Sequence, residues 1–151
     1  MLDRRACRDH RGHHPWRFIG QFPDWVVEWR NDLEPEDRGL TIFAEKKILM
    51  ADDAGQAERR GVICHEGTHV VRGPFPARRK MYEEALADRQ AARLLMPSVR
   101  RIGHAMAFHR GDYEAAADHL WVDEKLLNVR LSTLAPKERA WLAEQMEIIL
   151  V

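Results

Sequence analysis

Cysteine and net charge are the two things that this 151-residue chain has least of. Its only cysteines are Cys7 and Cys64, so no disulfide framework can be predicted, which suits a reducing compartment. Lys plus Arg and Asp plus Glu both total 24, which argues against a protein that binds nucleic acid through bulk positive charge. The chain has no apolar signal core and no run approaching the length of a membrane span, so we expect a cytoplasmic protein.

The sequence divides into an irregular N-terminal segment and a longer part with the pattern of a globular domain. Residues 1–14 are polar and basic without periodicity, so we predict a flexible N-terminal extension. From residue 15 onward apolar residues recur regularly, and the hydrophobic content of 45% suffices for one domain with a real core. We expect residues 15–97 to form this core and residues 98–151 to form helices that pack on it.

Three short segments are typical of β-strands. Trp25–Trp29 places alternate apolar side chains on one face, and Leu40–Ala44 and Lys47–Ala51 flank a tight turn near Glu45–Lys46. A charged loop separates the first strand from the second. We therefore predict a small sheet with antiparallel pairing.

One stretch carries the pattern H-E-x-x-H, formed by His65, Glu66 and His69 in an apolar context that indicates a buried helix. Residues four apart on an α-helix lie on the same face, so both imidazoles can reach one metal ion. Zinc hydrolysis needs two neutral nitrogen ligands, a third ligand from elsewhere and a general base near the open position. The pattern therefore predicts a zinc peptidase in which Glu66 is the catalytic base.

The helix that carries this motif is predicted to begin near Asp52–Asp53, because acidic groups are favourable at its positive end. It ends at Gly73–Pro74, since a helix interior does not accept proline. Gly67, inside the motif, would leave room for a substrate backbone or a packed strand, although glycine could simply be tolerated there. Cys64, turned away from the metal ligands, is expected to be a small buried core residue.

A second helix, predicted over Lys80–Met96, carries two carboxylates on its apolar face. Glu84 and Asp88 lie four residues apart and point inward, which is costly unless a charge compensates them. A zinc site would do so, with Glu84 as the third ligand and Asp88 accepting a hydrogen bond from a ligating histidine. The alternative is that both pair with nearby arginines. Glu83 points about 100° away from them and is expected on a solvated face.

The chain resembles the ImmA/IrrE family of metallopeptidases in two motifs. These are H-E-x-x-H at residues 65–69 and E-x-x-A-D-x-x-A-A-x-L-L-M-P at residues 84–97. Segments 56–60, 120–123 and 134–140 are similar to the compact forms common in actinobacteria and their phages. The resemblance covers residues 15–142 and departs at Gln90, where the family usually carries an aromatic residue. We expect this departure to affect packing beneath the site more than the chemistry.

The resemblance implies an α+β fold with a gluzincin-like core, in which a small sheet packs on the motif helix and its partner helix. It implies Zn2+ held by His65, His69 and Glu84, with Glu66 as general base and proton donor and Asp88 supporting a ligand. Members of the family cleave, or promote the cleavage of, helix-turn-helix repressors of mobile elements or stress responses, and others belong to toxin–antitoxin-like operons. The implied partner is therefore a repressor or antitoxin protein.

The last third of the chain is predicted to be helical. Ser98 is a suitable N-cap for a helix that reaches His109, and three more helices are expected over Asp112–Leu120, Asp123–Leu131 and Pro136–Ile149. Residues 115–131 could be aligned loosely with a helix-turn-helix. We favour a packed helical pair instead, because the helix that would read DNA is mixed in charge.

Three functions remain open at this stage: an active endopeptidase, a catalytically silent member that binds a repressor or antitoxin, and a DNA-binding regulator. We prefer catalysis, because the ligands and the base are all present. A second electrophile usually stabilises the oxyanion in such reactions. The sequence does not identify it, and a structural or surface role explains each of the candidates better; they are Tyr82, His104, His109 and Tyr113.

Overall fold

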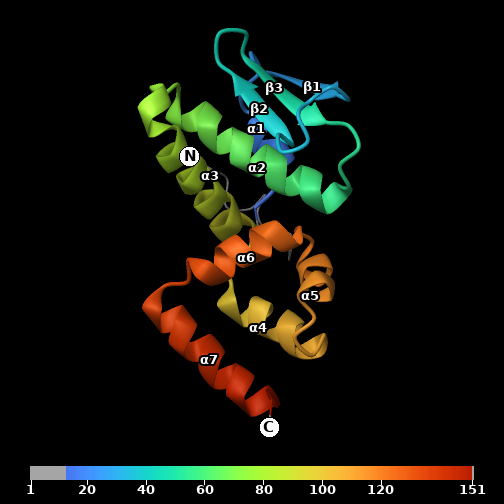
Figure 1. Ribbon diagram of the computed structural model, residues 1–151, viewed down its shortest axis with the longest axis vertical. Coiled ribbons are helices and arrows are strands. Elements are labelled where there is room, and N and C mark those ends of the chain that lie inside the picture. The colour runs from blue at the N-terminus through green and yellow to red at the C-terminus, as the bar shows by residue number, and fades with distance from the viewer. Residues whose placement is uncertain (1–12, 151) are drawn as a thin grey trace.

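The computed structural model describes residues 13–150, with side chains described up to residue 147. Within this part the fold is α+β, as predicted, with seven α-helices and one three-stranded sheet (Figure 1). Residues 1–12, most of the extension that we predict to be flexible, lie outside the described part of the chain. Between residues 13 and 150 no helix is long and apolar enough to cross a membrane.

The sheet is mixed, so the prediction of a purely antiparallel sheet is wrong. Its strands are β1 (Val26–Arg30), β2 (Gly39–Ile42) and β3 (Lys47–Ala51), in the order β1-β3-β2. β3 pairs in parallel with β1 and in antiparallel fashion with β2. Alternation of apolar residues predicts which face of a strand is buried, but it does not predict the strand's neighbour. The signal for the central strand is the unbroken apolar run Ile48–Ala51, which is buried throughout.

The first helix, α1 (Pro15–Ile19), was not predicted from the sequence. Its N-cap is His14, whose ring nitrogen accepts a hydrogen bond from the backbone N–H of Arg17. Ile19 packs in a small apolar cluster with Ile63 of the next helix and with two residues of β3. α1 is short because its only strong local signals are a cap and a proline at the first position.

The metal motif lies on α2 (Gln56–Arg72), which starts later than predicted because residues 52 and 53 form a turn. α2 ends as predicted, at Gly73, where φ is 83°. A 3-10 turn, η1 (Ala77–Arg79), leads into α3 (Lys80–Leu95), which also matches its predicted range closely.

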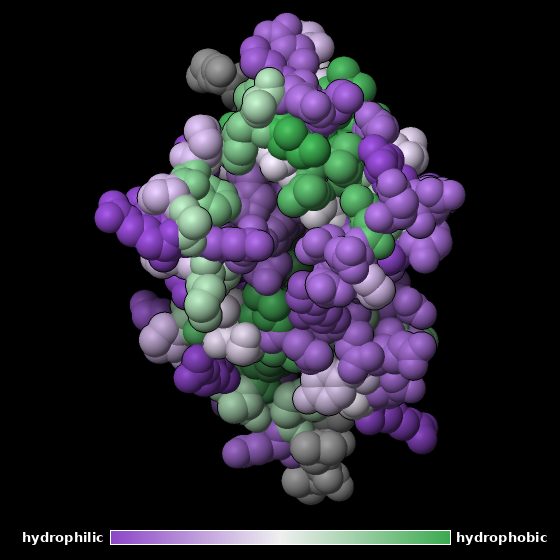
Figure 2. Space-filling model, turned by 45° about the horizontal axis from the view of Figure 1, so that its top comes forward, coloured by the Kyte–Doolittle hydropathy of each residue, from purple (hydrophilic) through white to green (hydrophobic). Residues whose placement is uncertain are grey.

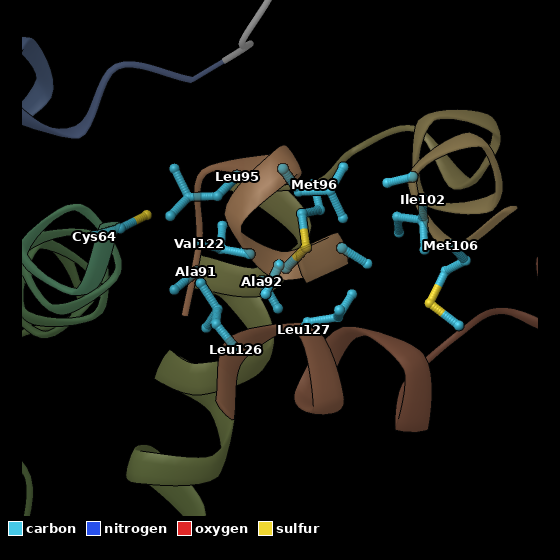
Figure 3. Packing of buried hydrophobic residues seen from close by; sticks show 14 residues of the cluster. Cys64, Ala91, Ala92, Leu95, Met96, Ile102, Met106, Val122, Leu126 and Leu127 are labelled. Carbon is cyan, nitrogen blue, oxygen red and sulfur yellow. The ribbon is translucent and has the colours of Figure 1, made fainter. Parts of the chain in front are cut away.

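α2 lies between the sheet and the helices α3 to α6 that follow it in the chain (Figure 1). On one side Ile63 packs against the sheet cluster, and on the other Cys64 joins the larger helical core shown in Figure 3. That core takes residues from α3 to α6, so the C-terminal helices share it with the metal-motif helix. Cys64 is buried as predicted, and burial raises the pKa of its thiol to about 12.

Four helices complete the chain, close to their predicted ranges: α4 (Val99–Phe108), α5 (Tyr113–Leu120), α6 (Glu124–Ser132) and α7 (Pro136–Leu150). Three of these helices have an N-cap side chain that accepts a hydrogen bond from a backbone N–H of the first turn. The three N-cap residues are Ser98, Asp112 and Asp123. These caps explain why the sequence placed the helix starts well.

The helix that would read DNA in a helix-turn-helix is α6, and its basic residue Arg130 is 0% exposed. The Nε atom of Arg130 donates to the carbonyl of Met96 at 2.8 Å, and its two terminal nitrogens donate to Glu138 at 3.0 and 2.8 Å. Arg130 therefore ties α6 to the end of α3 and the start of α7 and cannot contact a phosphate.

Hydrophilic residues predominate on the face shown in Figure 2, and apolar residues gather in the upper half of the view. Among the exposed apolar side chains are Val26 of β1 and Leu40 of β2. Thr41, next to Leu40, points to the opposite side of the sheet and reaches Glu66 on α2. One face of the sheet thus supports the metal motif.

Candidate metal centre

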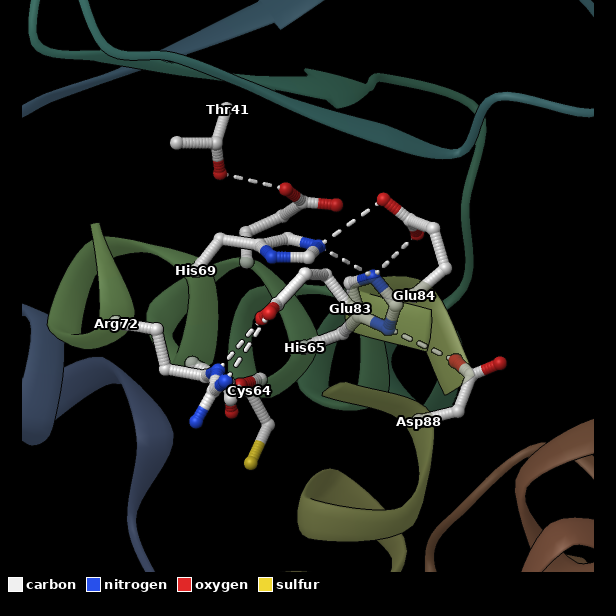
Figure 4. A network of polar contacts seen from close by, with 10 residues as sticks. Thr41, Cys64, His65, His69, Arg72, Glu83, Glu84 and Asp88 are labelled. Atoms are coloured by element: carbon white, nitrogen blue, oxygen red, sulfur yellow. Dashed lines mark hydrogen bonds and ion pairs between the residues drawn. The ribbon is translucent and has the colours of Figure 1, made fainter. Parts of the chain in front are cut away.

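α2 and α3 bring three possible metal ligands together, as Figure 4 shows. The Nε2 atoms of His65 and His69 are 3.1 Å apart. The carboxylate of Glu84 lies 3.0 Å from Nε2 of His65 and 3.2 Å from Nε2 of His69. These ligand atoms all lie within 4.8 Å of one another, and the three residues form a group that could hold a metal ion.

The spacing of these atoms suits a small tetrahedral ion. Two atoms bound to zinc at about 2.0–2.1 Å with tetrahedral angles lie about 3.3 Å apart. Nε2 of His65 lies 3.1 Å from Nε2 of His69 and 3.0 Å from Oε2 of Glu84, and Nε2 of His69 lies 3.2 Å from the other oxygen of Glu84, Oε1. An ion could therefore be accommodated with only small shifts of the three side chains.

Asp88 determines which nitrogen of His65 faces this group. Its Oδ1 lies 2.8 Å from Nδ1 of His65, and an ionised carboxylate can only accept, so Nδ1 carries the proton. In the neutral ring, Nε2 then presents a lone pair towards the carboxylate of Glu84, which is also an acceptor. Acceptors that converge in this way require a cation between them, either a proton or a metal ion.

Without a metal ion, that cation is a proton on His65. Burial opposes the charged ring, but hydrogen bonds with Asp88 and Glu84 outweigh it and raise the pKa of His65 to about 9. The hydrogen bond with His65 holds the pKa of Glu84 below its ordinary value, while burial lowers the pKa of His69. A metal ion that enters this group must displace the proton, so metal binding will depend on pH.

His69 is held differently from His65. Its side chain is almost fully buried, and its ring lies 5.5 Å from that of Phe75, centroid to centroid. Its Nδ1 is buried without a hydrogen-bond partner in the described part of the chain. The orientation of His69 therefore depends on packing and on the interactions of Nε2, whereas the ring of His65 is also fixed by Asp88.

Glu66, the predicted base, is only 5% exposed and lies beneath strand β2. Thr41 of that strand donates a hydrogen bond to Oε2 of Glu66 at 2.6 Å. Burial raises the pKa of Glu66 above its ordinary value, outweighing the hydrogen bond from Thr41 and the charge of His65. A carboxylate with a raised pKa can accept and hold a proton at a pH where an exposed one would not.

Gly39 is a second residue of this strand that sequence reasoning missed. A Cβ atom at this position would lie 2.4 Å from Cγ1 of Val62 and 2.9 Å from Oε1 of Glu66. β2 can therefore approach α2 this closely only because residue 39 is glycine. Gly67, for which we predicted a role in close approach, instead faces Phe18 of α1 at ordinary contact distance.

The site opens into a cleft of about 120 Å³ that is lined by His65, Glu66, Glu84 and Asp88. Two cations, Arg38 and Lys125, also line this cleft. They come from the loop before β2 and from α6, and no sequence motif pointed to them. None of the four candidate electrophiles predicted from the sequence lines the cleft; they are Tyr82, His104, His109 and Tyr113.

Two expectations for α3 are wrong. Glu83 is not on a solvated face but only 3% exposed, where its carboxylate pairs with Arg72 at 2.7 Å and with Arg79 at 3.0 Å. The end of α2 and the start of α3 lie close together. Glu83, which lies beside the helix face that carries Glu84 and Asp88, is therefore covered as well. Gln90, expected to influence packing beneath the site, is exposed.

The structure thus brings His65, His69 and Glu84 together as possible metal ligands, and Glu66 and Asp88 line the same cleft as His65 and Glu84. The chemical roles of all five residues stay predictions. Comparison of the chain with protein-family models, with curated proteins and with solved structures finds no match. The resemblance to the ImmA/IrrE family therefore rests on the sequence motifs alone.

Proposed function

We propose that this chain is a zinc-dependent endopeptidase that hydrolyses a peptide bond in a regulatory protein of the repressor or antitoxin type. The proposal rests on one observation above all. Nε2 of His65, Nε2 of His69 and the carboxylate of Glu84 lie close together beside a buried carboxylate, Glu66. Without a metal ion, a proton on His65 must hold this group together, whereas one metal ion would satisfy both rings and the carboxylate.

The choice of zinc follows from the ligand types. Two histidines and one glutamate are a donor set of catalytic zinc sites, which keep a fourth position for water or substrate. When bound, zinc supplies Lewis-acid activation of a water molecule and of the scissile carbonyl group. Asp88 contributes by fixing the tautomer of His65 and making its Nε2 more basic.

Glu66 carries the proton in this proposal. The hydroxyl of Thr41 donates a hydrogen bond to Oε2 of Glu66, so the other oxygen, Oε1, would take a proton from the attacking water. As the water oxygen bonds to the carbonyl carbon and the C–N bond breaks, Glu66 passes this proton to the leaving amine nitrogen. Its raised pKa favours uptake of this proton and lets the protonated carboxyl group persist until the amine nitrogen accepts the proton.

Strand β2 is placed to hold the substrate backbone. The backbone N–H of Ala51 on β3 donates a hydrogen bond to the carbonyl of Arg38. In an antiparallel pair every second residue of a strand bonds to its partner strand, so the N–H and C=O groups of Leu40 also point towards β3. The corresponding groups of Gly39 and Thr41 then face the open edge of the sheet. An extended peptide could pair with this edge directly above Glu66.

The dimensions of the cleft bear on the kind of substrate. A volume of about 120 Å³ is too small to take in a folded domain. The substrate would therefore present an exposed loop or linker, as a two-domain repressor or a partly unstructured antitoxin does. The assignment to regulatory proteins rests on the family resemblance.

The test uses the zinc-loaded chain and a Glu66→Gln variant with the proteins encoded beside its gene as substrates. We expect the wild type to produce discrete fragments, detected by mass spectrometry, and the variant to keep zinc but lose cleavage by a factor of about 10²–10⁴. Glu144→Gln, an exposed change on α7, is the matched control and should cleave normally. Cleavage at the wild-type rate by Glu66→Gln would refute the assignment of the base.

A further inference from the structure

A second cavity, of about 370 Å³, lies on another side of α2 and shares no lining residue with the metal cleft. Its wall comes from the start of α1, from β1, from the first turns of α2 and from the segment between α5 and α6. Its volume is in the range of small-molecule sites, which are usually apolar with a few placed polar groups. The metal site makes no use of it.

Three of the five tryptophans in the chain line this cavity: Trp16, Trp29 and Trp121. The rings of Trp16 and Trp29 lie 5.9 Å apart between centroids. The guanidinium of Arg59 lies 4.6 Å from the ring centre of Trp29, and that of Arg60 lies 5.3 Å from that of Trp121. The wall of the cavity thus combines flat aromatic rings with positively charged guanidinium groups.

The polar groups of the cavity favour an anion. Arg59 donates from Nη2 to the carbonyl of Asp52 at 2.7 Å, but its Nε is buried without a hydrogen-bond partner among residues 13–147. The same holds for Nε2 of His13. The unsatisfied Nε–H group of Arg59 is costly to bury, and an acceptor in the cavity would remove that cost.

Two further features agree with this charge preference. Gln56, the first residue of α2, lines the cavity, and its N-cap, Gly55, offers no side-chain acceptor to the free N–H groups of the first turn. No acidic side chain is among the described residues that line the cavity. Arg59 and Arg60 therefore give the described part of the wall an excess of positive charge.

We propose that this cavity binds a small aromatic anion, a flat ring that carries a phosphate or a carboxylate. The ring would lie against Trp29 and Trp16, and the acidic group would accept a hydrogen bond from Nε of Arg59. A nucleoside monophosphate and a fused-ring aromatic carboxylate both have this chemistry. The proposal does not depend on the metal centre.

The test is titration of the full-length protein, followed by tryptophan fluorescence and by calorimetry. AMP and 2-naphthoate are the probes, and they separate a phosphate from a carboxylate as the preferred acid. Adenosine, which lacks the charge, and inorganic phosphate, which lacks the ring, are the matched controls. We expect saturable binding of at least one probe and binding of both controls at least about tenfold weaker. Absence of saturation by either probe at millimolar concentration, or equal binding of adenosine and AMP, would overturn the proposal.

Variants locate the binding. Arg59→Leu should weaken probe binding at least about tenfold, because it removes both the charge and the free Nε donor. Arg59→Lys, which keeps the charge without that donor and preserves folding better, should also lose affinity. Arg89→Leu, at an exposed arginine of α3, should bind as the wild type does. Unchanged affinity in both Arg59 variants would place the ligand elsewhere. Because no residue is shared with the cleft, Glu66→Gln should bind the probe normally even if the peptidase proposal fails.

Discussion

At the scale of single residues, the metal centre depends on how one carboxylate fixes one ring. His65 has two nitrogens, and only the contact of Nδ1 with Asp88 directs the lone pair of Nε2 towards Glu84. His69 has no such support, because its Nδ1 is unpaired within the described residues. The two histidines are therefore held differently, and the orientation of the His65 ring depends on Asp88.

Replacing Asp88 by Asn should weaken zinc binding about 10–100-fold, because an amide does not stabilise the required tautomer of His65 as a carboxylate does. Competition with a chelator measures the change in Kd. Asp118→Asn, at an exposed position of α5, is the control and should leave Kd unchanged. Equal Kd values for the two variants would show that Asp88 does not support the ligand.

Gly39 gives a second test at this scale. Gly39→Ala should destabilise the fold by about 1–3 kcal/mol and also reduce activity, because its Cβ would overlap Val62 and displace Glu66. Gly55→Ala is the matched change, since nothing lies within 4 Å of a Cβ there. Urea unfolding compares the two. A Gly39→Ala variant as stable and active as Gly55→Ala would contradict the close approach of β2 to the base.

At the scale of elements, the site is built by α2 and α3, and those two helices were the most predictable part of the chain. Glu84 and Asp88 fall on an apolar face, and the glycine and proline signals at residues 73 and 97 give clear helix ends. The parts that were missed all depend on tertiary contact. The burial of Glu83, the hydrogen bond of Thr41 and the parallel pairing of β1 follow from how elements meet, which local periodicity does not encode.

Arg130 and Glu138 join three elements, so we expect their pair to control stability at low pH. The paired guanidinium lowers the pKa of Glu138 to about 2 from the ordinary 4.5. A depressed carboxylate pKa stabilises the fold above about pH 4.5, and this contribution is lost as the pH falls from about 4.5 towards about 2.

Glu138→Gln should therefore cost about 3 kcal/mol at pH 7, since it leaves the buried Arg130 without its counter-charge. The difference in free energy of unfolding between variant and wild type should shrink as the pH falls to 2. Urea denaturation at several pH values measures it, with Glu144→Gln as an exposed control on the same helix. A difference that stays constant with pH would exclude this role for the pair.

At the scale of the whole molecule, α2 is shared by the sheet cluster and by the helical core, so a ligand bound to α2 and α3 should stabilise the entire fold. Zinc at a free concentration of 100 times its Kd should add about 2.7 kcal/mol to the free energy of unfolding. For a domain of this size the Tm should rise by about 5–10 °C. Calorimetry of His69→Ala should show no such rise, and an equal rise in that variant would mean that zinc binds elsewhere.

The central claim is that His65, His69 and Glu84 together hold one catalytic zinc ion beside Glu66. The most direct test is the zinc content of the purified protein after dialysis, measured by elemental mass spectrometry. We expect one zinc ion per chain in the wild type and in Glu66→Gln, and less than about a tenth of that in His69→Ala and Glu84→Ala, since each of these loses a ligand. Zinc that is absent from the wild type, or that remains at one ion per chain in His69→Ala and Glu84→Ala, would contradict it.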